Sequence, residues 1–337
     1  MDQINIIGAG AWGTALAQVA AEAGRRVAIW AREPDVVKSV NKSHENSIFL
    51  PGFTLHNSIR ATASLARAAD ADALLLAVPA QFLRITTEAL ASHLNKQTAI
   101  VICTKGIELS SGALMNEVVK ALMPEQPLAI LSGPTFAIEV AQNLPTAVTL
   151  ACDDSVLGSR LCAALGTPRF RTYHSKDVIG AEIGGAVKNV LAIACGIVEG
   201  KRLGDNARAA IITRGLVEMA KLCVAKGGNP ETLMGLCGIG DLTLTCNAMQ
   251  SRNFSLGVAL GRGRSLDDVL SERTSVSEGV DTASAVTTLA DALDIEMPIC
   301  TAVNAIVGDG AQIDEIIKML LSRPIGAESP FTGIQQN

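Results

Sequence analysis

The chain has 337 residues, of which 48% are hydrophobic, 3% aromatic and 18% charged, and its formal net charge is −5. This composition excludes disordered and fibrous proteins, and the length favours two domains with separate cores. A slightly acidic chain has no general attraction for nucleic acid or an anionic membrane, so an anionic ligand needs a local site.

Seven short apolar runs predict buried β-strands, and helix-compatible segments separate them, as in a parallel sheet built from βαβ units. The predicted strands cover residues 4–7, 27–30, 74–78, 100–103, 128–131, 147–150 and 170–173. From residue 177 onward, Ala/Leu/Ile/Val-rich stretches at helical spacing are punctuated by glycines, which predicts a mostly helical half. We therefore predict an α/β domain with a mostly parallel sheet over residues 1–176 and an all-α domain over 177–337.

Several other classes of protein are disfavoured by what the sequence lacks. Eight cysteines contain no C-x-x-C pair and four histidines no H-x-x-x-H spacing, so we expect no metal site and no disulfide framework. The longest apolar runs fall short of the roughly 20 residues that span a bilayer. The first residues lead into a strand pattern without the basic start of a secretory signal, so we expect a cytoplasmic protein without membrane insertion.

A glycine-rich segment, INIIGAGAWGTALAQVA, covers the first predicted strand and continues into an Ala/Leu helix. Its GAGAWG motif at residues 8–13 therefore has the context of a dinucleotide-binding fingerprint. Gly8 permits the tight turn, Gly10 lets the backbone approach a pyrophosphate, and Gly13 lets helix and strand pack closely. The segment predicts an NAD(P) cofactor, the alternative being a glycine-rich turn without a ligand.

The second predicted strand ends in VAIWARE, residues 27–33. NAD-selective folds place an acidic residue here against the ribose hydroxyls, as Glu33 would be, whereas Arg32 suits a 2′-phosphate. A guanidinium bonds a phosphate through two donors, so we expect NADPH to be accepted with preference, although Glu33 is a rival partner for Arg32. The alternative is that Arg32 is an ordinary surface residue.

Lys188 lies in the middle of EIGGAVKNVLAIA, residues 182–194, a run of small and apolar residues. A structural lysine would extend its stem to water along an exposed face. On a helix, however, Gly184 and Gly185 share the face of Lys188, and such a setting strips water and favours the neutral amine. Hydride transfer to a ketone leaves an alkoxide that needs a proton, and a lysine with a lowered pKa can donate it and take it back.

Three further motifs carry polar groups suited to a ligand. Lys105 follows a predicted strand at the sheet edge where α/β folds gather ligands, or is an exposed loop lysine. Asp241, at the end of GIGD, orients a substrate hydroxyl or an active-site lysine, or else caps the helix start before LTLT. The SRN triplet at 251–253 offers a hydroxyl, a guanidinium and an amide to a phosphate dianion, or forms a solvated turn.

The motifs follow one another as ICTKGIE (102–108), LSGPTFAIEVA (131–141), EIGGAVKNVLAIA, GLCGIGDLTLTC (235–246), SRN and SEG (277–279). Together they resemble the bacterial NAD(P)-dependent glycerol-3-phosphate dehydrogenases, from residue 4 to about residue 320. The resemblance implies a Rossmann-like domain followed by an all-helical domain, usually in a homodimer. It also implies reversible hydride transfer between sn-glycerol 3-phosphate and dihydroxyacetone phosphate, which feeds glycerophospholipid synthesis.

By this resemblance, Lys188 is the proton acceptor in alcohol oxidation, and Lys105 touches both cofactor and substrate. We expect Lys188, Lys105 and Asp241 to be the catalytic residues. The remaining substrate-binding residues are Gly133, Thr135, Asp241, Ser251, Arg252 and Asn253. The cofactor-binding residues are Gly8, Gly10, Ala11, Trp12, Gly13, Arg32, Lys105, Ala137, Arg252, Val276 and Glu278. We expect NADP(H) or NAD(H) as cofactor without a metal, and a small phosphorylated substrate.

One residue departs from the family pattern, because serine is common where this chain has Ala11. We expect modestly weaker cofactor binding from the missing hydroxyl. The rival enzyme is a β-hydroxyacid dehydrogenase of the 6-phosphogluconate type, which has a similar lysine-asparagine pair. A regulatory Rossmann protein that binds NAD(P)H without turnover is the rival from another class, but it has no reason to keep Lys105, Lys188 and Asp241 together.

Overall fold

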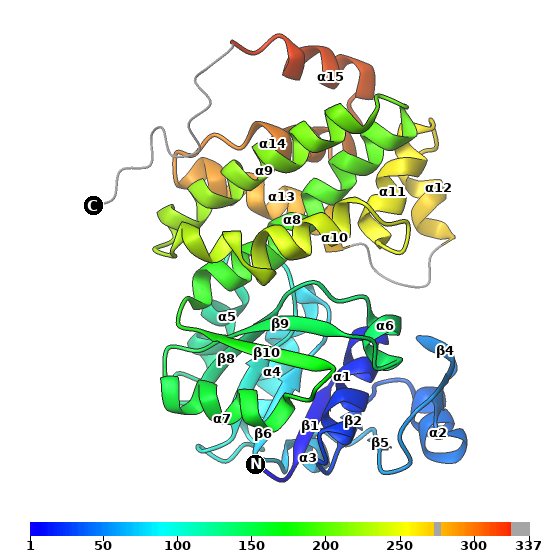
Figure 1. Cartoon of the computed structure of the whole chain (residues 1–337), viewed down its shortest axis with the longest axis vertical. Helices are drawn as coiled ribbons and strands as arrows, with labels where there is room; N and C mark the ends of the chain where they lie inside the picture. Colours follow the sequence, from blue (N-terminus) through cyan, green and yellow to red (C-terminus); the bar gives the residue numbers. More distant parts are fainter. Residues whose placement is uncertain (273–277, 325–337) are drawn as a thin grey trace. The chain divides into compact units, whose positions relative to one another are not determined.

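The computed structural model describes residues 1–272 and 278–324, which form two compact units. Unit 1 contains Met1–Lys105 and Met115–Val178, and unit 2 contains Gly106–Leu114 and the described residues from Ile179 onward. Figure 1 labels the elements of both units. The predicted fold class is confirmed, since unit 1 is built on a mostly parallel sheet and unit 2 is helical. Residues 106–114 belong to unit 2, although segments of unit 1 precede and follow them in the chain.

An eight-stranded sheet with the order β10-β9-β8-β7-β6-β1-β2-β5 forms the centre of unit 1. Its strands are β1 (Ile4–Ile7), β2 (Ala28–Trp30), β5 (Arg60–Thr62), β6 (Ala73–Leu76), β7 (Ala99–Ile102), β8 (Leu128–Ser132), β9 (Thr146–Ala151) and β10 (Phe170–Ser175). Every neighbouring pair is parallel except β8 and β9. The strands β1, β6 and β7 are buried throughout, as expected where helices cover both faces of a sheet.

Helices cover the two faces of this sheet in unit 1. They are α1 (Ala11–Glu22), α2 (Pro34–Ser43), α3 (Leu65–Ala69), α4 (Leu83–Ala91), α5 (Met115–Leu122), α6 (Ala137–Ala141) and α7 (Ser155–Leu165), with a 3₁₀ turn η1 (Ala80–Phe82). Ile4 and Ile6 of β1 share a core with α1, α6 and α7. The side chain of Asn5 points to the other face because residues alternate along a strand, and it donates to the Ala68 carbonyl of α3 at 2.9 Å.

All seven predicted strands are present, but three further strands were not predicted. The hairpin of β3 (Glu45–Asn46) and β4 (Leu50–Thr54) follows α2 and is antiparallel (Figure 1). These strands and β5 are short and partly exposed, so they lack the apolar run or clear alternation that marks a strand in a sequence. Sequence patterns detect mainly the buried part of the sheet.

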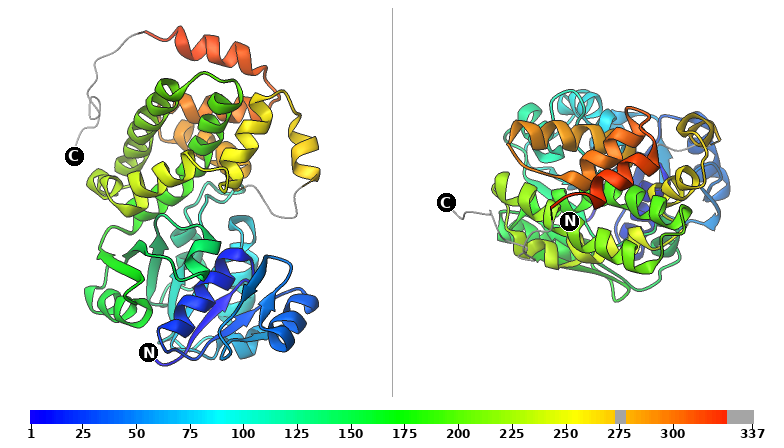
Figure 2. Two further views of the ribbon diagram at one scale, coloured as in Figure 1. Left: turned by 45° about the vertical axis from the view of Figure 1, so that its right-hand side comes forward. Right: turned by 90° about the horizontal axis from the view of Figure 1, so that it is seen from above.

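Unit 2 is helical in all its described elements beyond residue 178. They are α8 (Val178–Gly200), α9 (Asp205–Ala225), η2 (Pro230–Met234), η3 (Leu236–Gly240), α10 (Asp241–Cys246), α11 (Arg252–Gly261), α12 (Leu266–Ser271), α13 (Glu278–Ala292), α14 (Pro298–Val307) and α15 (Ile313–Leu321). Helix α8 lies among the other helices of the unit in Figures 1 and 2.

Helix α8 is longer than the apolar runs of the sequence suggest. With 23 residues it is long and apolar enough to cross a membrane, because Glu182 and Lys188 interrupt the apolar run but do not end the helix. Of its most apolar stretch, 94% is buried inside the structure. A helix that is apolar on all sides and covered by its neighbours is the core helix of its unit.

Glycines let α8 and α11 pack with their backbones in contact. A Cβ atom on Gly196 of α8 would lie 2.1 Å from the Phe254 carbonyl oxygen, and one on Gly257 of α11 would lie 2.1 Å from that of Ile193. Both distances are far too short for real atoms, so neither position tolerates a side chain without a shift of the helices. The contact fixes α11, which begins in the SRN triplet, against α8, which carries Lys188.

Candidate active site

Lys188 is buried, with 7% of the residue exposed, and its amine takes part in a polar cluster. Nζ donates to Asp241 Oδ1 at 2.5 Å and to Thr245 Oγ1 at 3.0 Å. The Thr245 hydroxyl in turn donates to the same Asp241 oxygen at 3.3 Å. We call these three residues the Lys188 cluster. The amine of Lys188 is therefore buried, whereas the amine of a structural surface lysine would extend to water.

The cluster forms because two helices meet at a glycine. Asp241 and Thr245 lie one helical turn apart on α10, so their side chains share a face. On α8, Gly184 lies one turn before Lys188, and a Cβ atom there would lie 2.2 Å from the Cys237 carbonyl oxygen. The missing side chain lets η3 approach α8 closely, and η3 leads directly into Asp241. Gly240, not Asp241, occupies the N-cap of α10.

Two opposing influences act on the Lys188 amine. Burial penalises the charged ammonium, whereas the Asp241 carboxylate, which is fully buried, favours it. An amine held between these influences can carry a proton in one step of a reaction and lack it in another, as a general acid and base must. The neighbouring Cys246 does not compete for this role, because a hydrogen bond with Cys195 and burial raise the pKa of its thiol.

Two buried polar residues near Lys188 in the structure or the sequence were not among the predicted site residues, although Asn189 was noted as part of the lysine-asparagine pair. Thr245 is 5% exposed and completes the cluster, and its four-residue spacing from Asp241 in DLTLTC is the signal that points to it. Asn189 is 5% exposed, and its Nδ2 has no hydrogen-bond partner among the described residues. A buried donor of this kind is normally satisfied by water or a ligand.

The SRN triplet forms the start of α11 rather than a solvated turn. Ser251 is the N-cap, and its hydroxyl accepts from Phe254 N at 3.2 Å. Asn253 is buried, and its Oδ1 accepts from Gly279 N of α13 at 3.1 Å. Arg252 is the exposed first residue of the helix. The guanidinium and the partial positive charge of the helix N-terminus are the groups here that attract an anion.

One of the two remaining candidates lies at the start of α13. Glu278 is its first residue and is half-buried. Val276 lies outside the described residues.

In unit 1, the glycines of the fingerprint differ in what surrounds them. Gly8 has a φ of +110°, and a Cβ atom on it would lie 2.8 Å from the Ala77 carbonyl oxygen. A Cβ atom on Gly13 would lie 1.9 Å from the Gly8 carbonyl oxygen. A Cβ atom on Gly10, the N-cap of α1, would meet nothing within 4 Å. The loop therefore combines a glycine turn, close helix-strand packing and an open side at the start of a helix, which fits the pyrophosphate of NAD(P).

Ala11 and Trp12 form the first turn of α1 and are both half-buried. The Nε1 atom of Trp12 is buried and has no hydrogen-bond partner in the described chain. Ala11 supplies no side-chain polar group at this helix start, so an anion there would depend on backbone N–H donors.

Arg32 and Glu33 pair with each other after β2. The Arg32 Nη2 and Glu33 Oε1 atoms are 3.2 Å apart, and the two side chains are 76% and 36% exposed. An exposed ion pair of this kind contributes about 0–1 kcal/mol. Glu33 therefore competes only weakly with a phosphate dianion for binding to the Arg32 guanidinium.

Three candidates on neighbouring strands of unit 1 meet at one carbonyl oxygen. Lys105 follows β7, and its Nζ donates to Gly133 O at 3.0 Å. Thr135 Oγ1 donates to the same oxygen at 3.1 Å. Gly133 follows β8 with a φ of +143°, which favours glycine. Ala137 comes next as the half-buried first residue of α6.

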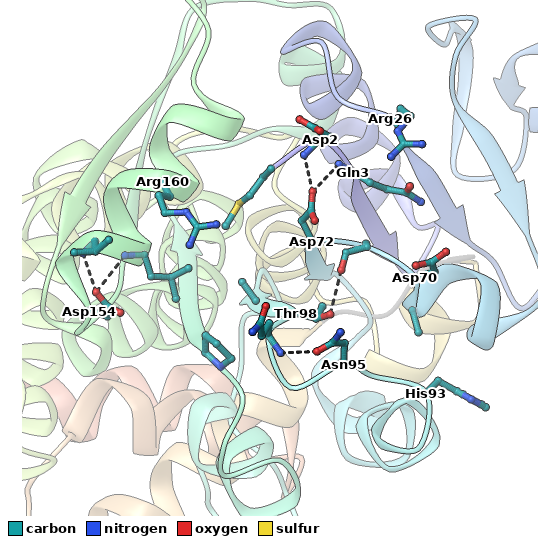
Figure 3. A pocket seen from close by; sticks show the side chains of 18 of the residues that line it. Asp2, Gln3, Arg26, Asp70, Asp72, His93, Asn95, Thr98, Asp154 and Arg160 are labelled. Carbon is teal, nitrogen blue, oxygen red and sulfur yellow. Dashed lines mark hydrogen bonds between the residues drawn. The ribbon is translucent and has the colours of Figure 1, made fainter.

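A surface cavity of about 580 Å³ lies at the edge of the sheet where the parallel strands begin (Figure 3). Lys105 and Gly133 follow their strands at the opposite edge, where these strands end. Gln3, Asp72, Thr98 and Pro127, which line the cavity, stand at or just before the first residues of β1, β6, β7 and β8. Figure 3 shows the Asp72 carboxylate bonded to the backbone N–H groups of Asp2 and Gln3, at 2.6 and 3.1 Å. None of the candidate residues lines this cavity, and open α/β sheets bind ligands at the carboxyl edge.

Comparison with known proteins supports the resemblance noted in the sequence. Residues 3–157 match the model of the NAD-dependent glycerol-3-phosphate dehydrogenase N-terminus, and residues 177–318 match that of the C-terminus. A Parvibaculum lavamentivorans protein named glycerol-3-phosphate dehydrogenase [NAD(P)+] is 57% identical over 97% of this chain and 98% of its own length. Its Caulobacter vibrioides counterpart of the same name is 53% identical over 97% and 99%.

Solved structures agree with these matches. The crystal structure of glycerol-3-phosphate dehydrogenase from Coxiella burnetii has a TM-score of 0.92 and 39% identity, covering 95% of this chain and 99% of that one. The ternary structure of D-mandelate dehydrogenase with NADH has a TM-score of 0.61 at 16% identity, which is a likeness of fold alone. Both halves of the chain match one family, and the chain therefore belongs to the NAD-dependent glycerol-3-phosphate dehydrogenases.

Proposed function

We propose that this chain is an oxidoreductase that reduces dihydroxyacetone phosphate to sn-glycerol 3-phosphate and catalyses the reverse oxidation. The family match and the names of the relatives support this reaction. The single observation that carries the mechanism is the buried contact of 2.5 Å between Lys188 Nζ and Asp241 Oδ1.

Lys188 serves as the general acid and base in this proposal. NAD(P)H, when bound, supplies the hydride for the carbonyl carbon. The Lys188 ammonium donates a proton to the oxygen of the resulting alkoxide, and in the oxidation the neutral amine accepts the hydroxyl proton. Asp241 stabilises the ammonium and, with Thr245, holds Nζ in one position. The energetic gain is largest where water is excluded, as it is around the buried Lys188 cluster.

The substrate phosphate binds at the start of α11 in this proposal. A dianion is attracted by the Arg252 guanidinium and by the helix N-terminus, and these interactions add without requiring a metal. Ser251 and Asn253 complete the group, since a hydroxyl or amide that also holds a helix start keeps further hydrogen-bonding capacity. In unit 1, Lys105, Gly133 and Thr135 are assigned to the substrate through the family resemblance.

The cofactor is assigned to the fingerprint loop. Gly8, Gly10 and Gly13 with the α1 N-terminus hold the pyrophosphate, and Ala11 and Trp12 lie beside it. Arg32 binds a 2′-phosphate and gives a preference for NADPH. Lys105, Ala137, Arg252, Val276 and Glu278 are carried over as cofactor contacts from the family pattern.

Three wider properties belong to the same proposal. We infer a homodimer, a cytoplasmic location and a supply of sn-glycerol 3-phosphate for glycerophospholipid synthesis. The homodimer and the lipid supply come from the family resemblance noted in the sequence, and the location is the expectation stated there.

Substrate profiling of the purified full chain tests the proposed reaction. Oxidation of NADPH and NADH is followed with dihydroxyacetone phosphate, and reduction of NADP⁺ and NAD⁺ with sn-glycerol 3-phosphate and with 6-phosphogluconate. We expect turnover with dihydroxyacetone phosphate and with sn-glycerol 3-phosphate, and none with 6-phosphogluconate. A folded protein that turns over 6-phosphogluconate alone would favour the rival β-hydroxyacid dehydrogenase, and cofactor binding without any turnover would favour a regulatory protein.

A further inference from the structure

Asn46, in β3, is fully buried and bonds directly to the fingerprint loop. Its Nδ2 donates to Ala9 O at 2.8 Å and to Thr14 Oγ1 at 2.8 Å. Its Oδ1 accepts from Phe49 N at 3.1 Å, in the turn between β3 and β4. One amide thus uses both of its donor hydrogens on the loop and α1, and its oxygen on the hairpin.

The bond to Ala9 fixes the orientation of one peptide group. In a trans peptide the carbonyl oxygen and the following N–H point in opposite directions. Since Ala9 O points at the buried Asn46 amide, the N–H of Gly10 points away from Asn46. Gly10 is the N-cap of α1, and the space around its missing side chain is open. This N–H belongs to the peptide that a pyrophosphate would approach.

Thr14 of α1 belongs to the same hydrogen-bonded group as Asn46 and Ala9. Its hydroxyl accepts from Asn46 and donates to Ala9 O at 3.4 Å, while its backbone N–H donates to Gly10 O at 2.9 Å. Thr14 is also fully buried. Within the described chain, the carbonyl of Ala9 therefore has two side-chain donors. Asn46 is the closer of the two and comes from outside the fingerprint and its helix.

We propose that Asn46 is a positioning residue for cofactor binding, which holds the Ala9–Gly10 peptide so that its N–H faces the pyrophosphate. This inference rests on the proposed function for the identity of the ligand. It assigns the β3–β4 hairpin to the support of the pyrophosphate loop, through the side chain of Asn46. Asn46 touches neither the cofactor nor the substrate and acts through Ala9 and Gly10.

Asn5 provides a matched control within unit 1. It is also fully buried, its Nδ2 donates to Ala68 O at 2.9 Å and to Asp70 O at 3.2 Å, and its Oδ1 accepts from Ala28 N at 2.9 Å. These bonds hold β1 to α3 and β2 and include no residue of the fingerprint loop. Asn46→Ala and Asn5→Ala therefore each remove three hydrogen bonds made by a fully buried amide.

The test measures the equilibrium dissociation constant of NADPH for the full chain by fluorescence titration, at a temperature well below the unfolding transition of each variant. Asn46→Ala is expected to raise this constant roughly tenfold, while Asn5→Ala leaves it within about twofold of wild type. In steady-state assays, Asn46→Ala raises KM for NADPH but leaves kcat and KM for dihydroxyacetone phosphate within about twofold. A merely structural residue would not separate these constants.

Unchanged NADPH binding in folded Asn46→Ala, or an equal loss in Asn5→Ala, overturns the proposal. If Asn46→Ala does not fold, Thr14→Val decides, since it removes one acceptor of the same amide with little change of shape. Weaker NADPH binding with unchanged KM for dihydroxyacetone phosphate supports the proposal, and unchanged NADPH binding overturns it. Because NADPH binding is measured without substrate, a wild-type chain that binds NADPH but lacks turnover would refute the proposed reaction and not the role of Asn46.

Discussion

Lys188 and Asp241 form a buried ion pair between two helices of unit 2, with 2.5 Å between Nζ and Oδ1. They are 53 residues apart in the chain and come together because Gly184 lets η3 lie directly against α8. A pair withdrawn from water is costly to break, since removal of one partner leaves an uncompensated charge. The arrangement therefore ties the reactive amine to one position in the fold.

Thr245→Val is expected to lower kcat about tenfold and to leave the fold intact. The valine keeps the shape of threonine but removes the hydroxyl that accepts from Lys188 and donates to Asp241, so Nζ loses one of the hydrogen bonds that hold it. Steady-state kinetics with saturating cofactor provides the measurement. Thr243→Val is the matched control, because Thr243 is exposed on the same helix. Equal effects in the two variants would show that the hydroxyl of Thr245 has no special role.

Arg32→Ala is expected to remove discrimination between the two cofactors. Among the described residues, the exposed guanidinium pairs only with Glu33, and weakly, so it is available for a 2′-phosphate. We expect the dissociation constant of NADPH to rise about tenfold while that of NADH stays the same. The companion variant Glu33→Gln frees the guanidinium and is expected to strengthen NADPH binding slightly. A wild-type chain that binds both cofactors equally, with no change in Arg32→Ala, would contradict this role.

Glu218 is expected to make the stability of the protein depend on pH. Burial raises the pKa of its carboxyl from 4.5 to about 7, although the N–H groups of Ile299 and Cys300, at the start of α14, oppose the rise. Between these two pH values the folded state binds more protons at this group than the unfolded state does. The contribution of Glu218 to the free energy of unfolding is therefore largest below pH 4.5 and falls as the pH rises to about 7.

Urea unfolding at several pH values between 4.5 and 7 measures this contribution. Glu218→Gln, which cannot ionise and keeps an acceptor for one of the two N–H groups, should flatten the pH dependence relative to wild type. An identical slope in both proteins would mean that Glu218 does not titrate in this range.

Sequence patterns predicted the buried framework of unit 1 because its strands are continuous apolar runs. The strand β1 and its glycine loop illustrate this, since local residue types determine both. The antiparallel direction of β9 was not predictable, because a buried strand has the same apolar pattern in either direction. The Asn46 contact was missed for a related reason, as its partners Ala9 and Thr14 are distant in the chain.

In the candidate site, too, local residue types were predictable from the sequence, whereas contacts between distant residues were not. Lys188 and Asp241 stand out as charged residues in apolar or glycine-rich surroundings, but their mutual contact depends on how α8 packs against η3 and α10. Thr245 carries no such contrast and was overlooked, although helical spacing places it beside Asp241. The roles of the individual site residues in catalysis and binding remain predictions.

The acid/base role of Lys188 is tested most directly by the kcat of Lys188→Ala for dihydroxyacetone phosphate reduction, with and without added alkylamines. Lys201→Ala is the control, since Lys201 follows the same helix and pairs with Asp314 at 2.6 Å on the surface. The account predicts a fall of about a thousandfold in Lys188→Ala, partial recovery with small primary amines, unchanged NADPH binding and a nearly normal Lys201→Ala. A folded Lys188→Ala protein with wild-type kcat would contradict it.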